Sequence, residues 1–260
     1  MNGRIFSPQK SFQHIETVQS GTLVVYIHGI TEGPEQFREL IDYTTSLHND
    51  SVALVLPGHG GSAMDFSRSN GTEWRNYVNA QLDTFRKQYK RIFIVGHSMG
   101  GLLAINTYCY NPQSIVGIVT IGCPIYVWVT ARAVHNLLGF RYFPTDTNEE
   151  HVTLQNVINV APGPTLEYRH WIPRIKDLFM LIDDTRKNLP AIHIPLLAIQ
   201  GMQDELVDAK HSLSYFTEHT DSNCLSTLRL AESTHLRYSE NDKKTMEEAI
   251  LSFINTHDKP

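Results

Sequence analysis

Short apolar runs, separated by more polar segments, dominate the hydrophobic pattern of this 260-residue chain. Most runs are rich in Val, Ile and Leu and do not alternate with polar residues, which is typical of parallel strands covered by helices on both faces. The last run alternates, which favours a strand at the edge of the sheet. The predicted strands cover residues 22–28, 51–56, 91–96, 114–122, 194–201 and 225–231.

Apolar residues at helical spacing occupy the segments between these strands. Pro34 stands in the first turn of one predicted helix, a favoured place for proline, and Thr72 is expected to cap another. Strand and helix therefore alternate, which predicts an α/β fold with a mostly parallel, doubly wound sheet and helices on both faces. The predicted helices cover residues 34–48, 72–89, 99–110 and 245–257.

Residues 124–190 interrupt this alternation, because they contain no convincing strand and are rich in aromatic side chains. Residues 171–184 within this segment keep apolar positions at helical spacing. We expect 124–190 to form an inserted, mostly helical cap, or lid, above the carboxyl edge of the sheet, where open α/β sheets bind ligands. Residues 1–123 and 191–260 would then form one core, and a separate small domain is the alternative. The aromatic residues are Tyr126, Trp128, Phe140, Tyr142, Phe143, Tyr168, Trp171 and Phe179.

Charge and composition narrow the class of protein. The formal net charge is −5 and no run is rich in lysine or arginine, so a nucleic-acid partner is not expected. No apolar stretch has the length of a signal peptide or a membrane span, which favours a cytoplasmic protein. Cys109, Cys123 and Cys224 are scattered and odd in number, so we expect small buried side chains instead of disulfides or a zinc site. The oligomeric state has no signature in the sequence.

Ser98 is the first candidate for chemistry. It lies in Gly96-His97-Ser98-Met99-Gly100, between a predicted strand and a predicted helix. A sharp turn of this kind strains the serine backbone and presents Oγ at the sheet edge, and the flanking glycines avoid crowding. The amino end of the following helix suits an oxyanion. We therefore interpret Ser98 as a nucleophile.

A serine hydroxyl needs a base to remove its proton, and the base is usually a histidine. His235 lies after the last predicted strand and before the last helix, in a loop that can reach back over the sheet edge. His211 and His219 lie in or beside a predicted helix and are expected at the surface. His235 is therefore the predicted base.

A carboxylate should orient this histidine and should follow the preceding strand, because the order in such folds is serine, acid, histidine. The loop after residues 194–201 offers three acids, of which Asp204 is favoured. Glu205 and Asp208 are the alternatives. Asp208 has a second interpretation, as an acid that stabilises the amino end of a following helix.

An oxyanion hole requires two backbone N–H groups. Met99 follows the nucleophile, and Ile30 lies in the loop after the first core strand, so these two residues are the predicted donors. Three histidines near the predicted site, His28, His59 and His97, are expected to be structural and hydrogen-bonded rather than catalytic.

Over nearly the whole chain these motifs resemble the α/β-hydrolase family, and most closely its bacterial carboxylesterase and monoacylglycerol lipase branch. The resemblance implies a triad of Ser98, Asp204 and His235, and hydrolysis of acyl esters without a cofactor or metal. Segment 125–170 departs from that branch, since it is longer and more aromatic, and no glycine precedes His235. The motifs are HG at 28–29, PGHG at 57–60, GHSMGG at 96–101, GMQDELV at 201–207 and STHL at 233–236.

Other functions are compatible with the same residues. A Ser-His-Asp triad also serves thioesterases, amidases and carbon–carbon bond hydrolases, because function depends on the site and not on the fold. A non-catalytic ligand-binding protein could keep the triad. A haloalkane dehalogenase is disfavoured, since it would carry an aspartate at position 98. The aromatic cap favours an apolar acyl or aryl group, as in monoacylglycerols, short acyl esters or lysophospholipids.

Overall fold

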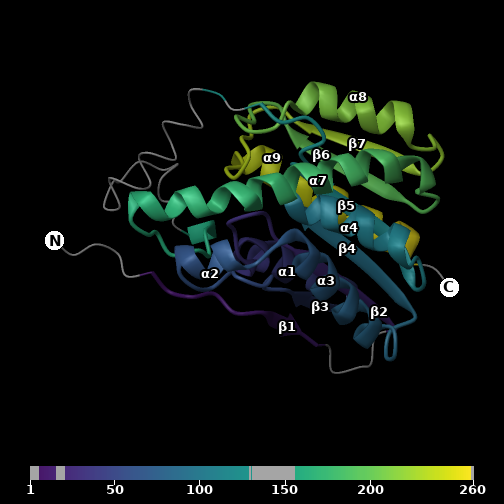
Figure 1. The fold of residues 1–260 in the computed structure, drawn as a ribbon. Coiled ribbons are helices and arrows are strands. Elements are labelled where there is room, and N and C mark those ends of the chain that lie inside the picture. Colours follow the sequence, from purple (N-terminus) through teal and green to yellow (C-terminus); the bar gives the residue numbers. More distant parts are fainter. Residues whose placement is uncertain (1–5, 16–20, 129, 131–155, 259–260) are drawn as a thin grey trace.

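A central sheet of seven strands organises the protein (Figure 1). The structure is a computed structural model and describes residues 6–15, 21–128, 130 and 156–258. The strand order is β1-β3-β2-β4-β5-β6-β7, and every pair of neighbouring strands is parallel except β1 and β3. The strands are β1 Phe12–His14, β2 Thr22–Ile27, β3 Asp50–Ala53, β4 Arg91–His97, β5 Ile115–Ile121, β6 Leu196–Gly201 and β7 Leu225–Leu230.

This sheet confirms the predicted fold class and all six predicted strands, including the edge position of the last, β7. Strand β1 has no counterpart in the sequence prediction. It is three residues long and pairs antiparallel with β3, and its side chains are partly exposed, so it carries no run of apolar residues.

Helices alternate with the strands as expected, with differences at their ends. The N-terminal cap of α3 is Asn70 and not Thr72, because the Asn70 side chain accepts a hydrogen bond of 3.0 Å from the Glu73 N–H. Ser239 caps α9, which therefore begins before the predicted residue 245. The helices are α1 Arg38–Thr44, α2 Ala63–Arg68, α3 Gly71–Phe85, α4 Met99–Tyr110, α7 Ile172–Asn188, α8 Ala209–His219 and α9 Glu240–His257, with short 3-10 turns at Pro34–Phe37, Thr45–Leu47, Thr165–Trp171 and Leu189–Ala191.

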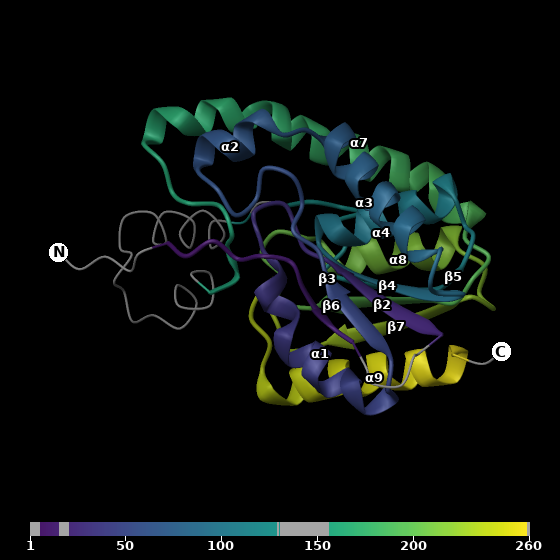
Figure 2. The same cartoon turned by 90° about the horizontal axis from the view of Figure 1, so that it is seen from below.

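The helices form two layers around the sheet (Figure 2). Helices α1 and α9 cover one face, where Leu40, Ile41 and Ile250 join its apolar cluster. The other face is covered by α3, α4, α7 and α8. Both faces of the central strands are therefore buried, which explains why their sequences are apolar without alternation.

The order of the strands indicates where a ligand site is expected. The chain goes from β2 outward to β3 and then returns across β2 to form β4, so the direction of winding reverses between β2 and β4. Ligand sites in open α/β sheets lie outside the carboxyl ends of the strands at such a reversal. The loop after β2 and the turn after β4 both lie there, and they contain Ile30 and Ser98.

The predicted cap, residues 124–190, lies partly outside the described residues, and so do Phe140, Tyr142 and Phe143. Its last part forms α7, which packs along α4 and α3 through the buried Leu181 and Ile182. The boundaries of the cap stay a prediction. In the described part of the chain, no helix is both long enough and apolar enough to cross a membrane.

Candidate active site

Ser98 occupies a strained turn between β4 and α4. Its backbone angles are φ 52° and ψ −121°, which cost a residue with a side chain about 1–3 kcal/mol. A Cβ atom on Gly96 would overlap the backbone of Gly100, and one on Gly100 would overlap the carbonyl oxygen of Ile27. The glycines allow this close approach, and the turn presents Ser98 at the amino end of α4, as predicted.

The three residues predicted to act together are in hydrogen-bond contact. The Nε2 atom of His235 lies 3.0 Å from Ser98 Oγ, and its Nδ1 atom lies 2.7 Å from Asp204 Oδ2. Because a carboxylate only accepts, Nδ1 carries the proton and Nε2 is free to accept the serine proton. Asp204 and His235 are each 4% exposed and Ser98 is 7% exposed, so water has little access to this chain of hydrogen bonds.

Asp204 is itself held in a fixed orientation. Its Oδ1 atom accepts hydrogen bonds of 2.8 Å from the N–H groups of Leu206 and Val207, which leaves Oδ2 directed at His235. The two alternative acids have other roles. Glu205 accepts from the His235 main-chain N–H at 3.3 Å, and Asp208 caps α8 by accepting from the His211 N–H.

Charge around His235 favours its protonated form. Burial opposes that form, but the carboxylates of Asp204, Glu32 and Glu205 outweigh burial and raise the pKa of His235 above its ordinary value of 6.5. The same negative charges stabilise the imidazolium that forms when the ring takes a proton from serine. The arrangement therefore suits a histidine that must hold a proton during a reaction.

The two predicted oxyanion donors, Ile30 and Met99, lie in segments that meet near Ser98. Met99 is the first residue of α4, so its N–H has no partner within the helix. Among the described residues, none accepts a hydrogen bond from the Ile30 N–H. Because Gly100 packs against the end of β2, the loop that carries Ile30 lies close to the turn at Ser98. Their role in stabilising an oxyanion stays a prediction.

The predicted structural role of His28 and His59 agrees with their contacts. Both are buried, and His28 accepts from the Leu56 N–H through Nε2 at 3.1 Å, while its Nδ1 lies 2.8 Å from the Gly29 carbonyl oxygen. The Nε2 atom of His59 lies 2.8 Å from the carbonyl oxygen of Ile30. These rings fix the loop after β2, and burial lowers the pKa of each, to about 3 for His28.

Glu32 is a buried acid that no motif in the sequence indicated. Its Oε2 atom accepts hydrogen bonds from the Gly29 N–H, the Gln36 amide and the His97 ring, at 2.8, 2.9 and 2.7 Å. Burial opposes its charge, but His97 outweighs burial and, with His235 and Gln36, lowers the pKa of Glu32 to about 2. The only signal in the sequence is a carboxylate three residues after Gly29, in the loop beside the site.

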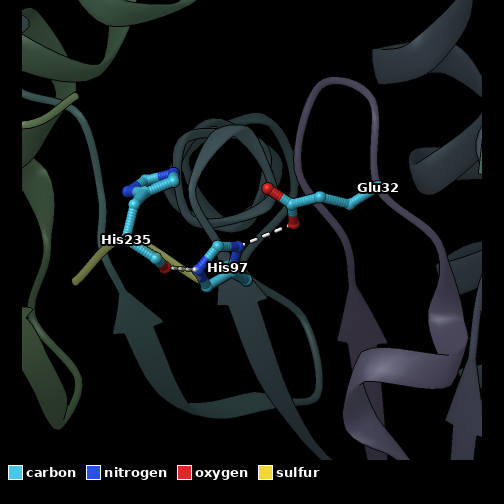
Figure 3. Close-up of side chains that lie close together, drawn as sticks. All are labelled: Glu32, His97 and His235. Carbon is cyan, nitrogen blue, oxygen red and sulfur yellow. Dashed lines mark hydrogen bonds and ion pairs between the residues drawn. The ribbon is translucent and has the colours of Figure 1, made fainter. Parts of the chain in front are cut away.

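Figure 3 shows Glu32, His97 and His235 together. Each offers one atom that could bind a metal, and these atoms lie within 4.8 Å of one another. However, both ring nitrogens of His97 and of His235 already have partners within the protein. A metal and the Asp204–His235–Ser98 hydrogen bonds would therefore compete for the same nitrogen atoms.

Both described ends of the predicted cap are bonded to loops of the site. At one end, Val127 pairs with Val207, and the Trp128 indole N–H donates to the Asp204 carbonyl oxygen at 3.3 Å. At the other end, the Asn159 N–H donates to the Thr31 carbonyl oxygen at 2.9 Å. The segment that leaves and re-enters the core thus contacts the acid loop and the loop after β2.

Comparison with known proteins agrees with this geometry. A model of the alpha/beta hydrolase family matches residues 24–241. A monoglyceride lipase homolog of Monkeypox virus is 26% identical over 262 residues, covering 89% of this chain and 88% of the relative. A thermostable monoacylglycerol lipase of Bacillus sp. (strain H-257) is 24% identical, covering 90% of each chain.

Among solved structures, one from the metagenome-derived lipolytic enzymes LipS and LipT superposes with a TM-score of 0.76. Its sequence is 21% identical, and the superposition covers 98% of this chain and 100% of that one. At this identity the likeness shows the fold.

Proposed function

The chain belongs to the alpha/beta hydrolase family, and from that premise we propose that it hydrolyses carboxylic esters as a serine esterase of the carboxylesterase or monoacylglycerol lipase type. The observation that carries the proposal is the hydrogen-bonded chain from Asp204 through His235 to Ser98 Oγ. The relatives named monoglyceride lipase and monoacylglycerol lipase support an ester substrate.

The first half of the reaction acylates Ser98. Its Oγ attacks the ester carbonyl carbon while His235 Nε2 takes the hydroxyl proton, and Asp204 stabilises the imidazolium through Nδ1. The negative charge that develops on the carbonyl oxygen is stabilised by the Ile30 and Met99 N–H groups. The tetrahedral intermediate then collapses, and His235 gives its proton to the departing alcohol.

The second half releases the acid. Water replaces the alcohol, His235 takes one of its protons, and the resulting hydroxide attacks the acyl-enzyme carbonyl carbon. Collapse of the second tetrahedral intermediate returns the proton to Ser98 Oγ and frees the carboxylic acid. The chain's own residues supply every proton transfer in this sequence.

An ester panel graded by acyl length and alcohol size tests the proposal. Ser98→Ala should lower turnover by about 10⁴-fold or more, because no other group supplies the attacking atom. It should also abolish labelling by a fluorophosphonate. Ser226→Ala, at an exposed serine of β7, is the matched control and should behave as wild type. Turnover or labelling that persists in Ser98→Ala would overturn the assignment.

The same panel separates the neighbouring chemistries. Ester, thioester and amide substrates with a common acyl group should be compared, and the ester is expected to be the best of the three. The monoacylglycerol specificity that the relatives suggest predicts faster turnover of a glycerol monoester than of a diester with the same acyl chain. The cytoplasmic location stays a prediction, which cell fractionation would test.

A further inference from the structure

His97 lies between Glu32 and the main chain of His235, as Figure 3 shows. Its Nδ1 atom is 2.7 Å from Glu32 Oε2, and its Nε2 atom is 3.0 Å from the carbonyl oxygen of His235. Both His97 and Glu32 are buried. The ring of His97 contacts neither Asp204 nor Ser98 Oγ in a hydrogen bond, so the mechanism above does not use it.

Both partners of His97 are acceptors. A carbonyl oxygen has no proton to give, so the bond to His235 requires a proton on Nε2 of His97. A neutral imidazole carries only one N–H, so donation at both ends requires the charged ring with the Glu32 carboxylate as its counter-charge. The pair therefore directs an N–H donor at the His235 backbone.

The main chain of His235 itself makes two hydrogen bonds, while the flanking Ser233 and Thr234 are bonded to Gln203 and Arg237. His235 lies in the loop between β7 and α9, outside regular secondary structure. Its N–H donates to Glu205 at 3.3 Å, and its carbonyl oxygen accepts from His97 at 3.0 Å. These two contacts hold the N–H and the carbonyl oxygen of His235, whose ring must bridge Asp204 and Ser98. A shift of this backbone would move Nε2 away from Ser98 Oγ.

We propose that Glu32 and His97 are positioning residues, which hold the main chain of the base His235 so that its ring stays aligned between Asp204 and Ser98. The proposal rests on the serine esterase function stated above. It assigns His97 a task beyond the structural role of His28 and His59, whose hydrogen bonds reach the loops after β2 and β3 and not the base.

Two substitutions of His97 separate its two contacts. The amide nitrogen of glutamine is as many bonds from Cβ as Nε2 of histidine, so His97→Gln can keep a donor at the His235 carbonyl. The amide nitrogen of asparagine corresponds to Nδ1 instead, so His97→Asn can keep the contact to Glu32 but cannot reach His235. Both variants remove the ring and leave an amide, which makes them a matched pair.

We expect His97→Asn to lower kcat by about 10- to 100-fold, because a misplacement of about 1 Å at a reacting group has effects of this size. KM should change less than kcat, since His97 is assigned no contact with the substrate. His97→Gln should recover most of the lost kcat. Glu32→Gln should lower kcat less than His97→Asn, because its amide can donate to Nδ1 and leave the proton on Nε2.

The measurement is kcat and KM per active site, with active sites counted by complete fluorophosphonate labelling, so that unfolded protein does not lower kcat. Thermal unfolding of each variant is recorded beside it. If the role of His97 is purely structural, His97→Asn should have a lower melting temperature and an unchanged kcat. Alternatively, kcat should fall equally in His97→Asn and His97→Gln. Either result would overturn the proposal. If wild type itself lacks turnover that depends on Ser98, the esterase function fails instead.

Discussion

The turn at Ser98 and the outer face of α7 are packed in opposite ways. Residues 96–101 are all buried, and the backbone of this turn leaves no room for a Cβ atom on Gly96 or Gly100. On α7, by contrast, Ile172 and Phe179 are 58% and 49% exposed, although their spacing would suit a buried face. The inner side of the same helix, at Leu181, is fully packed.

The turn and the outer face of α7 differ in the number of structural constraints on each residue. At the turn, backbone strain, close approach of two segments and a reactive hydroxyl all act on a few neighbouring positions, so few amino acids fit. On the outer face of α7, no contact within the described residues demands a particular side chain. We therefore expect substitutions at the turn and its partners to have large effects on kcat and on the free energy of unfolding. Substitutions on the outer face of α7 should have small effects.

After the loss of the nucleophile itself, substitution of the orienting acid should have the largest effect. Asp204→Asn keeps the shape but allows the amide to donate to His235, which favours the wrong tautomer, so kcat should fall by about 10⁴-fold. Asp208→Asn is the matched control, because asparagine also caps helices well and α8 should be preserved. Steady-state kinetics on one ester compares the two. An equal fall of kcat in the two variants would show that the integrity of the loop, and not the Asp204 carboxylate, determines the rate.

A side chain added within the turn should have the next largest effect, on the free energy of unfolding. Gly100→Ala places a Cβ atom against the carbonyl oxygen of Ile27, and overpacking of a rigid core costs about 1–3 kcal/mol, or more where backbone must move. Gly21→Ala is the control, since a Cβ there meets nothing within 4 Å and should change the free energy of unfolding by less than about 0.5 kcal/mol. Urea denaturation measures both. Similar values for the two would contradict the tight packing at Gly100.

The geometry of the candidate site was largely predictable from the sequence because its parts follow strands. Ser98, Asp204 and His235 come after three strands whose carboxyl ends share one edge, so the order of elements alone brings them together. Glu32 was missed, since a lone carboxylate in a loop has no periodic signal and its partner His97 is distant in sequence.

The errors in the fold have similar local causes. Asparagine and threonine both cap helices, and the choice of Asn70 over Thr72 depends on which residue has extended backbone angles. Strand β1 pairs through its backbone and buries little apolar surface, so no hydrophobic pattern in the sequence predicts it.

The pH dependence of activity tests the charge around His235. A general base must be unprotonated, so kcat/KM should be high above the pKa of His235 and fall as the pH drops through it. Because nearby carboxylates raise that pKa, the acidic limb should lie above pH 6.5. Glu205→Gln removes one of these charges and should move the limb to lower pH, whereas Asp208→Asn should leave it in place. A limb that moves to higher pH in Glu205→Gln would contradict this account.

The smallest effect is expected on the outer face of α7. Phe179→Ala removes a half-exposed ring and should change the free energy of unfolding by less than about 0.5 kcal/mol. Leu181→Ala, two residues later on the packed side, should cost about 2–5 kcal/mol, because it leaves a cavity beside α4. Urea denaturation of both variants compares the two sides of one helix at nearly the same point. A large loss in Phe179→Ala would show that this face is packed in solution, and the contrast with the turn at Ser98 would then disappear.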